Sequence, residues 1–182
     1  MDERLKFAKK QREAHPQKPF IHPSVNIPDW VKLGKNITIH ENCTIGTEGF
    51  GFAQDVNGKW LHIPHIGQVL LEDDVEIFAG TNIDRGTVDN TIIGKGTKID
   101  HHCHIGHNVK IGKNCLITAM ALIGGSSTIG DNVWIGPNST ILDHITIGDN
   151  VYIGAQTNVI KSVEDNVVVV GNPARVIRKK HV

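Results

Sequence analysis

Residues 105–135 read IGHNVKIGKNCLITAMALIGGSSTIGDNVWI, with an isoleucine at every sixth position. The spacing continues on both sides, so that twelve successive hexads from Ile93 to Val159 begin with an aliphatic residue. It also occurs upstream, from Ile21 to Ile45 and from Leu71 to Ile83. Short straight segments with a corner every six residues are typical of a parallel β-helix shaped as a triangular prism. The sequence therefore predicts an all-β solenoid in which three hexads make one coil.

A second position in each hexad supports this prediction. Four residues after each aliphatic residue stands a small or β-branched one: Thr97, Cys103, Val109, Cys115, Ala121, Ser127, Val133 and Ser139. Because side chains alternate along a strand, both positions are expected to face the interior. Gly and Asn recur between them and tolerate the left-handed backbone of a sharp corner. The three cysteines (Cys43, Cys103 and Cys115) fall on the small position, so we expect buried structural thiols.

Two segments break the repeat. Residues 46–68 form a long excursion, and Asn57-Gly58 within it predicts a tight hairpin turn. Loops of this length on a regular scaffold usually serve binding. The second break is TNIDRGTVDNTIIG at 81–94, where Ile83 and Ile93 are ten residues apart rather than the twelve of two hexads.

The domain prediction has three parts. Residues 1–20 are expected to form an N-terminal helical cap or lead-in, with a short charged helix over 2–13. Residues 21–160 form the β-helix domain, and residues 161–182 a C-terminal cap in which NPARVIRKK is helical or irregular. Such caps cover the open ends of a solenoid core.

Composition excludes several function classes. Nineteen basic residues balance nineteen acidic ones, which leaves no global electrostatic footprint for a nucleic acid. The apolar runs are too short to span a membrane, and MDERLKFAKKQREA lacks the apolar region of a signal peptide. An odd number of cysteines with no export signal favours reduced thiols, so we expect a cytoplasmic protein without integral membrane association.

Three stretches carry a resemblance to a known family. They are GFGFAQDVNGKWLHIPHIGQV at 49–69, NIDRGTVDNTIIG at 82–94 and CHIGHNVKIG at 103–112. From about Ile21 to Val159 the chain resembles the UDP-3-O-acylglucosamine N-acyltransferases of lipid A synthesis, which are hexapeptide-repeat enzymes. The resemblance implies a left-handed β-helix.

Two departures concern the ends. That family carries an N-terminal uridine-binding domain, whereas about 20 residues precede the first hexad here. The tail VVGNPARVIRKK resembles that of acetyl-CoA-dependent hexapeptide acetyltransferases.

The resemblance also implies a catalytic set. His107, in GHN, matches the family's general-base histidine, and Gly125 would supply an amide N–H for the oxyanion. Gly125 follows by 18 residues, one coil on and about 5 Å away. A base and an oxyanion donor are the minimum for acyl transfer from a thioester. His144 matches a further family histidine, two coils from His107, that could orient substrate or donor. His101, in DHHC, resembles the base of bacterial sugar N-acetyltransferases and is the rival candidate.

Further residues are candidates for binding. Asp84 and Arg85 could hold a sugar or phosphate, or equally form a structural ion pair, and Asn108 belongs to the GHN motif. Phe50, Phe52 and Trp60 in the excursion could stack on a base or sugar ring, or merely pin the loop. In the tail, Asn172 and Arg175 are the predicted donor contacts, with more basic residues at Arg178, Lys179 and Lys180.

A metal site is not predicted. γ-Class carbonic anhydrases share the implied fold and bind zinc with three histidines, one of them in a GHN motif. The matching positions for the other ligands here are Gly112 and Leu71, which cannot coordinate zinc.

The predicted function is N-acyl transfer to a nucleotide-linked amino sugar, with acetyl-CoA as the expected donor. The resemblance implies a homotrimer, which fits the preference for closed symmetry. The first alternative is an acyl-carrier-protein thioester as donor, in an enzyme like those of lipid A synthesis. Sugar O-acetyltransferase, γ-class carbonic anhydrase and non-catalytic scaffold are the remaining alternatives.

Overall fold

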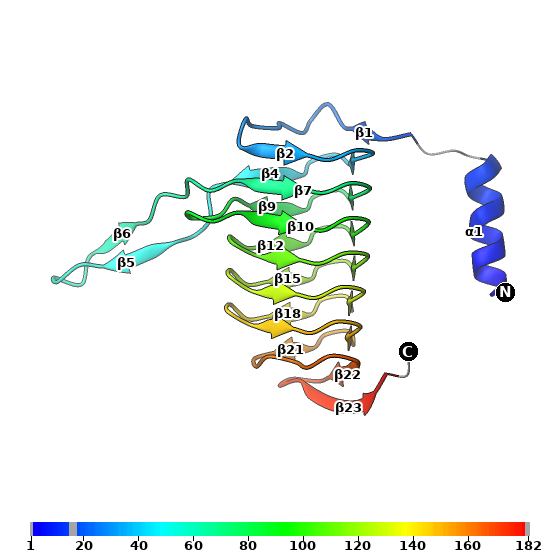
Figure 1. Cartoon of the computed structure of the whole chain (residues 1–182). Coiled ribbons are helices and arrows are strands. Elements are labelled where there is room, and N and C mark those ends of the chain that lie inside the picture. Colours follow the sequence, from blue (N-terminus) through cyan, green and yellow to red (C-terminus); the bar gives the residue numbers. More distant parts are fainter. Residues whose placement is uncertain (1, 15–17, 181–182) are drawn as a thin grey trace.

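The computed structural model describes residues 2–14 and 18–180. Its body is a stack of coils whose short strands form three sheets, parallel except at the last strand of the chain (Figure 1). The first sheet contains β1 (Phe20–Ile21), β3 (Thr38–Ile39), β8 (Glu76–Ile77), β11 (Lys98–Ile99), β14 (Leu116–Ile117), β17 (Trp134–Ile135), β20 (Tyr152–Ile153), β22 (Val167–Val170) and β23 (Arg175–Lys179). The second contains β4 (Thr44–Thr47), β9 (Asn82–Asp84), β12 (His104–Ile105), β15 (Leu122–Ile123), β18 (Thr140–Ile141) and β21 (Asn158–Val159). The third contains β2 (Val31–Leu33), β7 (Val69–Leu71), β10 (Thr91–Ile93), β13 (Lys110–Ile111), β16 (Thr128–Ile129) and β19 (Thr146–Ile147).

The six-residue repeat sets the path of the chain. Each coil passes from the first sheet to the second, then to the third, and strands 18 residues apart pair in parallel, as Ile99 pairs with Ile117. The repeating isoleucines line the interior, and Ile105, Ile117 and Ile129 are at most 2% exposed. The predicted β-helix and its inward-facing aliphatic positions are confirmed.

A core substitution is expected to be costly because these isoleucines are packed on every side. We expect Ile117→Ala to lower the free energy of unfolding by about 2–5 kcal/mol, the usual cost of removing a buried isoleucine side chain. Chemical denaturation measures the change. Leu116→Ala, at the partly exposed neighbouring position, is the matched control and should cost clearly less. Equal losses in the two variants would contradict the assigned strand orientation.

The small inward position holds polar groups because they bond to the backbone of the next coil. The Thr97 hydroxyl donates to the Gly112 carbonyl at 2.9 Å and accepts the Cys115 N–H at 3.0 Å. The three cysteines are buried free thiols, as predicted. Burial raises the pKa of Cys103 to about 11, which keeps this thiol protonated and unreactive at neutral pH.

The corners need a left-handed backbone, and Asn is the residue that supplies it most often. Asn114 and Asn132 have φ of 53° and 57°. His102, Asn108 and His144 occupy the equivalent position at other corners, also with positive φ. Asn and His are among the residues that enter this region most readily.

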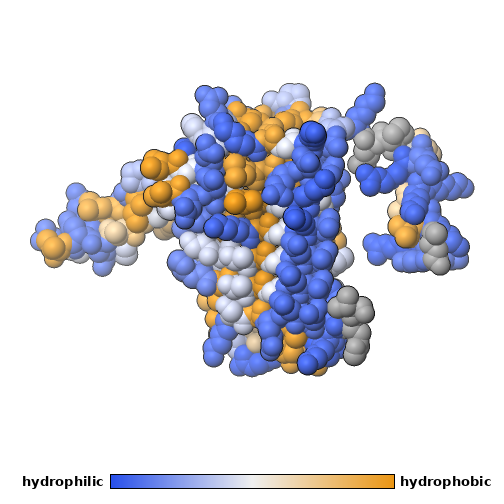
Figure 2. Space-filling model, viewed as in Figure 1, coloured by the Kyte–Doolittle hydropathy of each residue, from blue (hydrophilic) through white to orange (hydrophobic). Residues whose placement is uncertain are grey.

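The ends of the chain differ from the prediction. The predicted N-terminal helix is present as α1 (Glu3–Ala14), but it buries none of its residues and stands beside the prism (Figure 1). It is mostly hydrophilic (Figure 2) and lacks an apolar stripe that could pack on the core. The first coil therefore stays partly open, with Ile21 and Leu33 each 37% exposed. In the tail, β23 pairs antiparallel with β22, so the helical option for NPARVIRKK is wrong.

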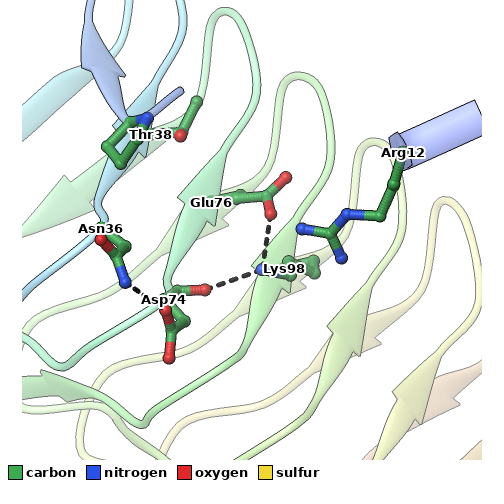
Figure 3. A pocket seen from close by; sticks show the side chains of 7 residues that line it. Arg12, Asn36, Thr38, Asp74, Glu76 and Lys98 are labelled. Atoms are coloured by element: carbon green, nitrogen blue, oxygen red, sulfur yellow. Dashed lines mark hydrogen bonds and ion pairs between the residues drawn. The ribbon is translucent and has the colours of Figure 1, made fainter. Parts of the chain in front are cut away.

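A polar hollow of about 420 Å³ lies between α1 and the first sheet (Figure 3). Lys98 crosses it and donates to Glu76 Oε1 and to the Asp74 carbonyl, both at 2.7 Å. Arg12 reaches the same hollow from α1. Because the charges here compensate one another, the hollow is not a candidate site.

The breaks in the repeat are insertions at one corner. Ile83 lies in the second sheet and Ile93 in the third, so a step that normally takes six residues takes ten. The break is thus four extra residues, not the loss of two from a pair of hexads. The excursion 46–68 leaves from the same corner between β4 and β7. Within it, β5 (Phe52–Gln54) and β6 (Trp60–His62) form the predicted hairpin, which projects from the prism (Figure 1).

Candidate active site

One edge of the prism gathers most of the predicted site. We call the corner between the second and third sheets the site edge; it carries residues 46–68, 85–90, 106–109, 124–127 and 142–145. An open groove of about 440 Å³ follows it, lined by Thr87, Asp89, His107, Asn108, Lys110, Ser126, Thr128 and His144. His107, Asn108 and His144, which are distant in the sequence, therefore share one groove.

The tautomer of His107 follows from its neighbours. Its Nδ1 lies 2.9 Å from Asn108 Oδ1, and the Thr87 backbone N–H donates to the same oxygen at 3.0 Å. Because a backbone N–H can only donate, it places the amide oxygen of Asn108 on this side. Asn108 Nδ2 donates to the Asp89 carbonyl at 3.2 Å, which agrees with that orientation. Nδ1 of His107 must then carry the proton, which leaves a lone pair on Nε2, as a general base requires.

These contacts give Asn108 a positioning role. Thr87 and Asp89 belong to the four-residue insertion, so the irregular step supplies the partners that orient the GHN motif. The predicted substrate contact of Asn108 stays a prediction: its side chain lines the groove, while its amide oxygen and one amide hydrogen bond within the protein.

Gly125 lies directly against the imidazole of His107. A Cβ added to Gly125 would be 2.7 Å from His107 Nε2 and 2.8 Å from Cε1, too close for any side chain. Its φ is not positive, so contact with His107 is the reason for glycine here. The ring thus occupies the space that a side chain at position 125 would fill.

The N–H of Gly125 is available to a ligand. At the same corner position of neighbouring hexads, carboxylates cap the backbone: Asp131 accepts the Lys113 N–H, and Asp149 accepts the Asp131 N–H, both at 2.7 Å. Within residues 2–14 and 18–180, no protein group accepts the Gly125 N–H. An uncapped donor therefore lies beside the basic nitrogen of His107.

His144 lies one further coil along the site edge. Its backbone N–H donates to the Gly125 carbonyl at 3.0 Å, and its side chain is 73% exposed in the groove. Asp143 Oδ2 is 3.8 Å from its Nε2. His144 can therefore reach a ligand in the groove without moving the backbone.

The excursion covers the other side of His107. A Cβ on Gly49 would lie 2.9 Å from His107 Cβ, and the His65 ring stands edge-on to that of His107, with centroids 5.1 Å apart. His65 is 3% exposed, and neither ring nitrogen has a partner among the described residues. Burial lowers the pKa of His65, and His107 adds to the effect. A buried polar group left unpaired costs about 1–3 kcal/mol.

His65, His62 and Glu48 form a group that was not predicted from the sequence. The side-chain ligand atoms of these three residues lie within 4.8 Å of one another. The spacing H-I-P-H at 62–65 was a visible signal, but nothing in the repeat relates it to position 48.

The DRG segment is engaged within the chain. Arg85 Nε and Nη2 donate to the carbonyls of Gly67 and Ile66 at 2.7 and 3.0 Å, and its guanidinium stacks on Trp30. Asp84 is buried and accepts hydrogen bonds from Asn82 and Thr47. Both side chains fasten the insertions to the prism, which leaves little of either for a sugar or phosphate.

The excursion aromatics form an apolar surface on the hairpin. Phe50, Phe52 and Trp60 line a hollow of about 350 Å³, and Phe50 is 88% exposed. Hydrophobic residues are visible along this arm in Figure 2. The rings are free to contact a ligand or another protein surface, and they lie outside the groove that holds His107.

The predicted donor contacts lie at the far end of the stack. Asn172 Oδ1 accepts from Asn158 Nδ2 at 3.1 Å, and Arg175 is exposed beside Lys161 and Ser162. These two residues follow β21 at the same corner, one coil beyond the site edge. The corner at residue 161 is three coils beyond His107, or roughly 14 Å by strand spacing. A ligand would have to lie along the site edge to touch both.

The rival base His101 lies on a different edge, between the first and second sheets. Its Nδ1 is 2.6 Å from Asp100 Oδ1, and the side chain is half exposed. Glycine occupies no matching place beside its ring, and the groove of His107 does not include it.

Comparison with known proteins agrees with this architecture. The bacterial transferase hexapeptide model, which spans six repeats, matches residues 90–125 and again residues 126–161. Residues 90–161 are hexapeptide repeats of the bacterial transferase type. The resemblance predicted from the sequence is confirmed by this match and by the relatives below.

The curated relatives include UDP-3-O-acylglucosamine N-acyltransferases. That of Coxiella burnetii is 44% identical over 90 residues, which is 50% of this chain and 26% of the relative. That of Francisella tularensis is 54% identical over 70 residues, which is 38% of this chain and 21% of the relative. The matched part is thus about a quarter or less of each relative.

Solved structures extend the likeness of fold to most of the chain. The UDP-N-acetylglucosamine O-acyltransferase of Moraxella catarrhalis has a TM-score of 0.68 at 22% identity, covering 87% of this chain and 74% of that one. A single-residue mutant of AntD, an N-acyltransferase of Bacillus cereus solved with dTDP and coenzyme A, has a TM-score of 0.64 at 18% identity. This match covers 82% of this chain and 84% of that one. The shared fold is the left-handed β-helix, as predicted.

No helix within the described ranges is long and apolar enough to cross a membrane.

Proposed function

We propose that this chain catalyses N-acyl transfer from a thioester to the amino group of a nucleotide-linked amino sugar. The observation that carries the proposal is the pairing, in one groove, of a His107 Nε2 lone pair with the uncapped N–H of Gly125. The names of the matched relatives support an acylated UDP-amino sugar as the substrate class.

The geometry suits the following step. The amine nitrogen attacks the thioester carbonyl carbon, and His107 Nε2 takes the proton that the nitrogen loses. The carbonyl oxygen gains negative charge and accepts the Gly125 N–H. When the carbon–sulfur bond breaks, the imidazolium can return its proton to the leaving thiolate. Asn108 holds Nδ1 and accepts its N–H throughout, which also favours the imidazolium that forms.

Replacing Asn108 tests its positioning role. We expect Asn108→Leu to lower kcat about 10–100-fold, the scale on which outer partners of a functional histidine act, with little change in donor KM. The loss arises because His107 can then adopt the other tautomer. Asn114→Leu, at the equivalent corner one hexad later, controls for the strain of Leu at positive φ. An equal loss in both variants would assign the effect to the backbone.

The donor is proposed to be acetyl-CoA, with an acyl-carrier-protein thioester as the alternative. The GNPAR-type tail favours the first, since Asn172 and Arg175 could meet the phosphates of coenzyme A. The relatives favour the second. Initial rates with acetyl-CoA, longer acyl-CoAs and acyl-carrier-protein thioesters, on UDP-linked amino sugars, decide between them. If none of these donors supports turnover, the proposal is wrong.

We propose that the active form is a cytoplasmic homotrimer, as the resemblance to the hexapeptide acyltransferases implies. The groove on the site edge is open on one side, and a neighbouring copy could close it. Phe50 and Phe52, exposed on the projecting hairpin, are available to such a copy or to its substrate. Sedimentation equilibrium at micromolar concentration tests the assembly, and a monomer there would exclude it.

A further inference from the structure

We propose that Glu48, His62 and His65 form a binding site for a divalent transition-metal ion such as Zn²⁺, at the base of the excursion. The three residues offer one carboxylate oxygen and two imidazole nitrogens, all within 4.8 Å of one another. Two histidines and a carboxylate are a ligand set that zinc accepts, with a fourth position left for water.

His65 is the residue that points to a ligand. Its ring is nine-tenths buried or more, yet neither nitrogen has a hydrogen-bond partner among the described residues. Hydrophobic residues or hydrogen-bonded polar ones are the usual occupants of such a position. A metal ion would satisfy one ring nitrogen of His65, which has no other partner among the described residues.

The surroundings leave access and orientation for an ion. Glu48 and His62 are about half exposed, so the cluster opens to solvent on one side while His65 closes the other. His62 Nε2 lies 3.7 Å from Glu48 Oε1, and that oxygen also accepts the His65 backbone N–H at 3.1 Å. The carboxylate is therefore already held between the two histidines.

The position of the site suggests a structural role. Glu48 stands where the excursion leaves β4, and His62 and His65 stand where it returns from the hairpin. One ion would thus close the loop between Glu48 and His62 and hold Gly49 and His65 against His107. The acyl-transfer step above does not use this ion.

Metal binding to the untagged full chain tests the site without any assay of activity. After incubation with zinc chloride and dialysis, we expect about one tightly bound ion per chain. Cobalt(II) should give the visible absorption of a four-coordinate ion. Hydrogen exchange of amides in residues 48–66 should slow when zinc is present, since the ion closes this loop.

Variants assign the ligands. His62→Gln and Glu48→Gln change exposed side chains, so the fold should persist, and each should weaken zinc binding by at least the roughly 10–100-fold that loss of an outer-shell partner costs. His65→Leu should abolish binding while leaving the metal-free protein as stable or more so, because an unpaired polar group is removed.

The matched control is the double variant His101→Gln and His102→Gln, which removes an exposed histidine pair on another edge. It should bind zinc like the unaltered chain. Absence of zinc and cobalt binding in the unaltered chain, or undiminished binding in both His62→Gln and Glu48→Gln, would overturn the proposal. Loss of binding in the control alone would place the ion at the other edge and overturn it equally.

Discussion

His107→Ala is expected to lower kcat about a hundredfold or more, the usual scale for loss of a general base. KM for the donor should change little, because the imidazole acts on the proton of the attacking amine and contributes little to ground-state binding. Steady-state kinetics with the donor found in the thioester screen measures both constants. The half-buried ring contacts Gly49, His65 and Gly125, so circular dichroism and thermal unfolding should accompany the kinetics.

His101→Ala is the matched control for this result. His101 is also a corner histidine with a hydrogen-bonded Nδ1, but it lies on a different edge of the prism. Its replacement should leave kcat within a few-fold of the unaltered chain. If His101→Ala were inactive and His107→Ala nearly unaffected, the catalytic site would lie on the edge of His101, and Gly125 would lose its proposed role.

Gly125→Ala is expected to have an effect of similar size, at least about a hundredfold in kcat. The added methyl would lie 2.7 Å from His107 Nε2, so the imidazole must leave the position in which it meets the amine. The methyl would also crowd the N–H that is proposed to bind the oxyanion. Removal of a single oxyanion donor costs about 10²–10³ in kcat in other acyl-transfer enzymes.

A double variant separates the two explanations for Gly125. If Gly125 acts only by leaving room for His107, then Gly125→Ala in a His107→Ala background should cost nothing further. A further loss in that background would show a role of the backbone N–H itself. Thermal unfolding of the same four proteins checks the fold. Full activity of the single Gly125→Ala variant would contradict both roles.

Much of this molecule follows from periodicity in the sequence. An isoleucine every sixth residue sets the strand length and the inward face, because only residues that repeat in step with the coil can share one core. The same period placed Gly125 one coil beyond His107 on the same edge of the prism, and it placed His101 on a different edge. These relations depend on residues 24 or fewer apart in a regular path, so they could be predicted without a structure.

The insertions carry no period, and their contacts came only from the tertiary structure. The sequence does not relate Thr87 and Asp89 to Asn108, yet these two residues orient its amide and so determine the His107 tautomer. Nor does it relate Glu48 to His65, which the hairpin brings back over 17 residues.

The tertiary structure likewise decided the uses of Arg85 and of the two ends of the chain. A charged residue can serve a ligand or the fold, and Arg85 donates to the carbonyls of the returning excursion and stacks on Trp30. α1 forms from local hydrogen bonds but has no apolar face to pack, so it does not cap the prism. The repeat determined the β-helix because every coil meets the same partners, whereas loop and end contacts depend on side chains that meet only once the chain has folded.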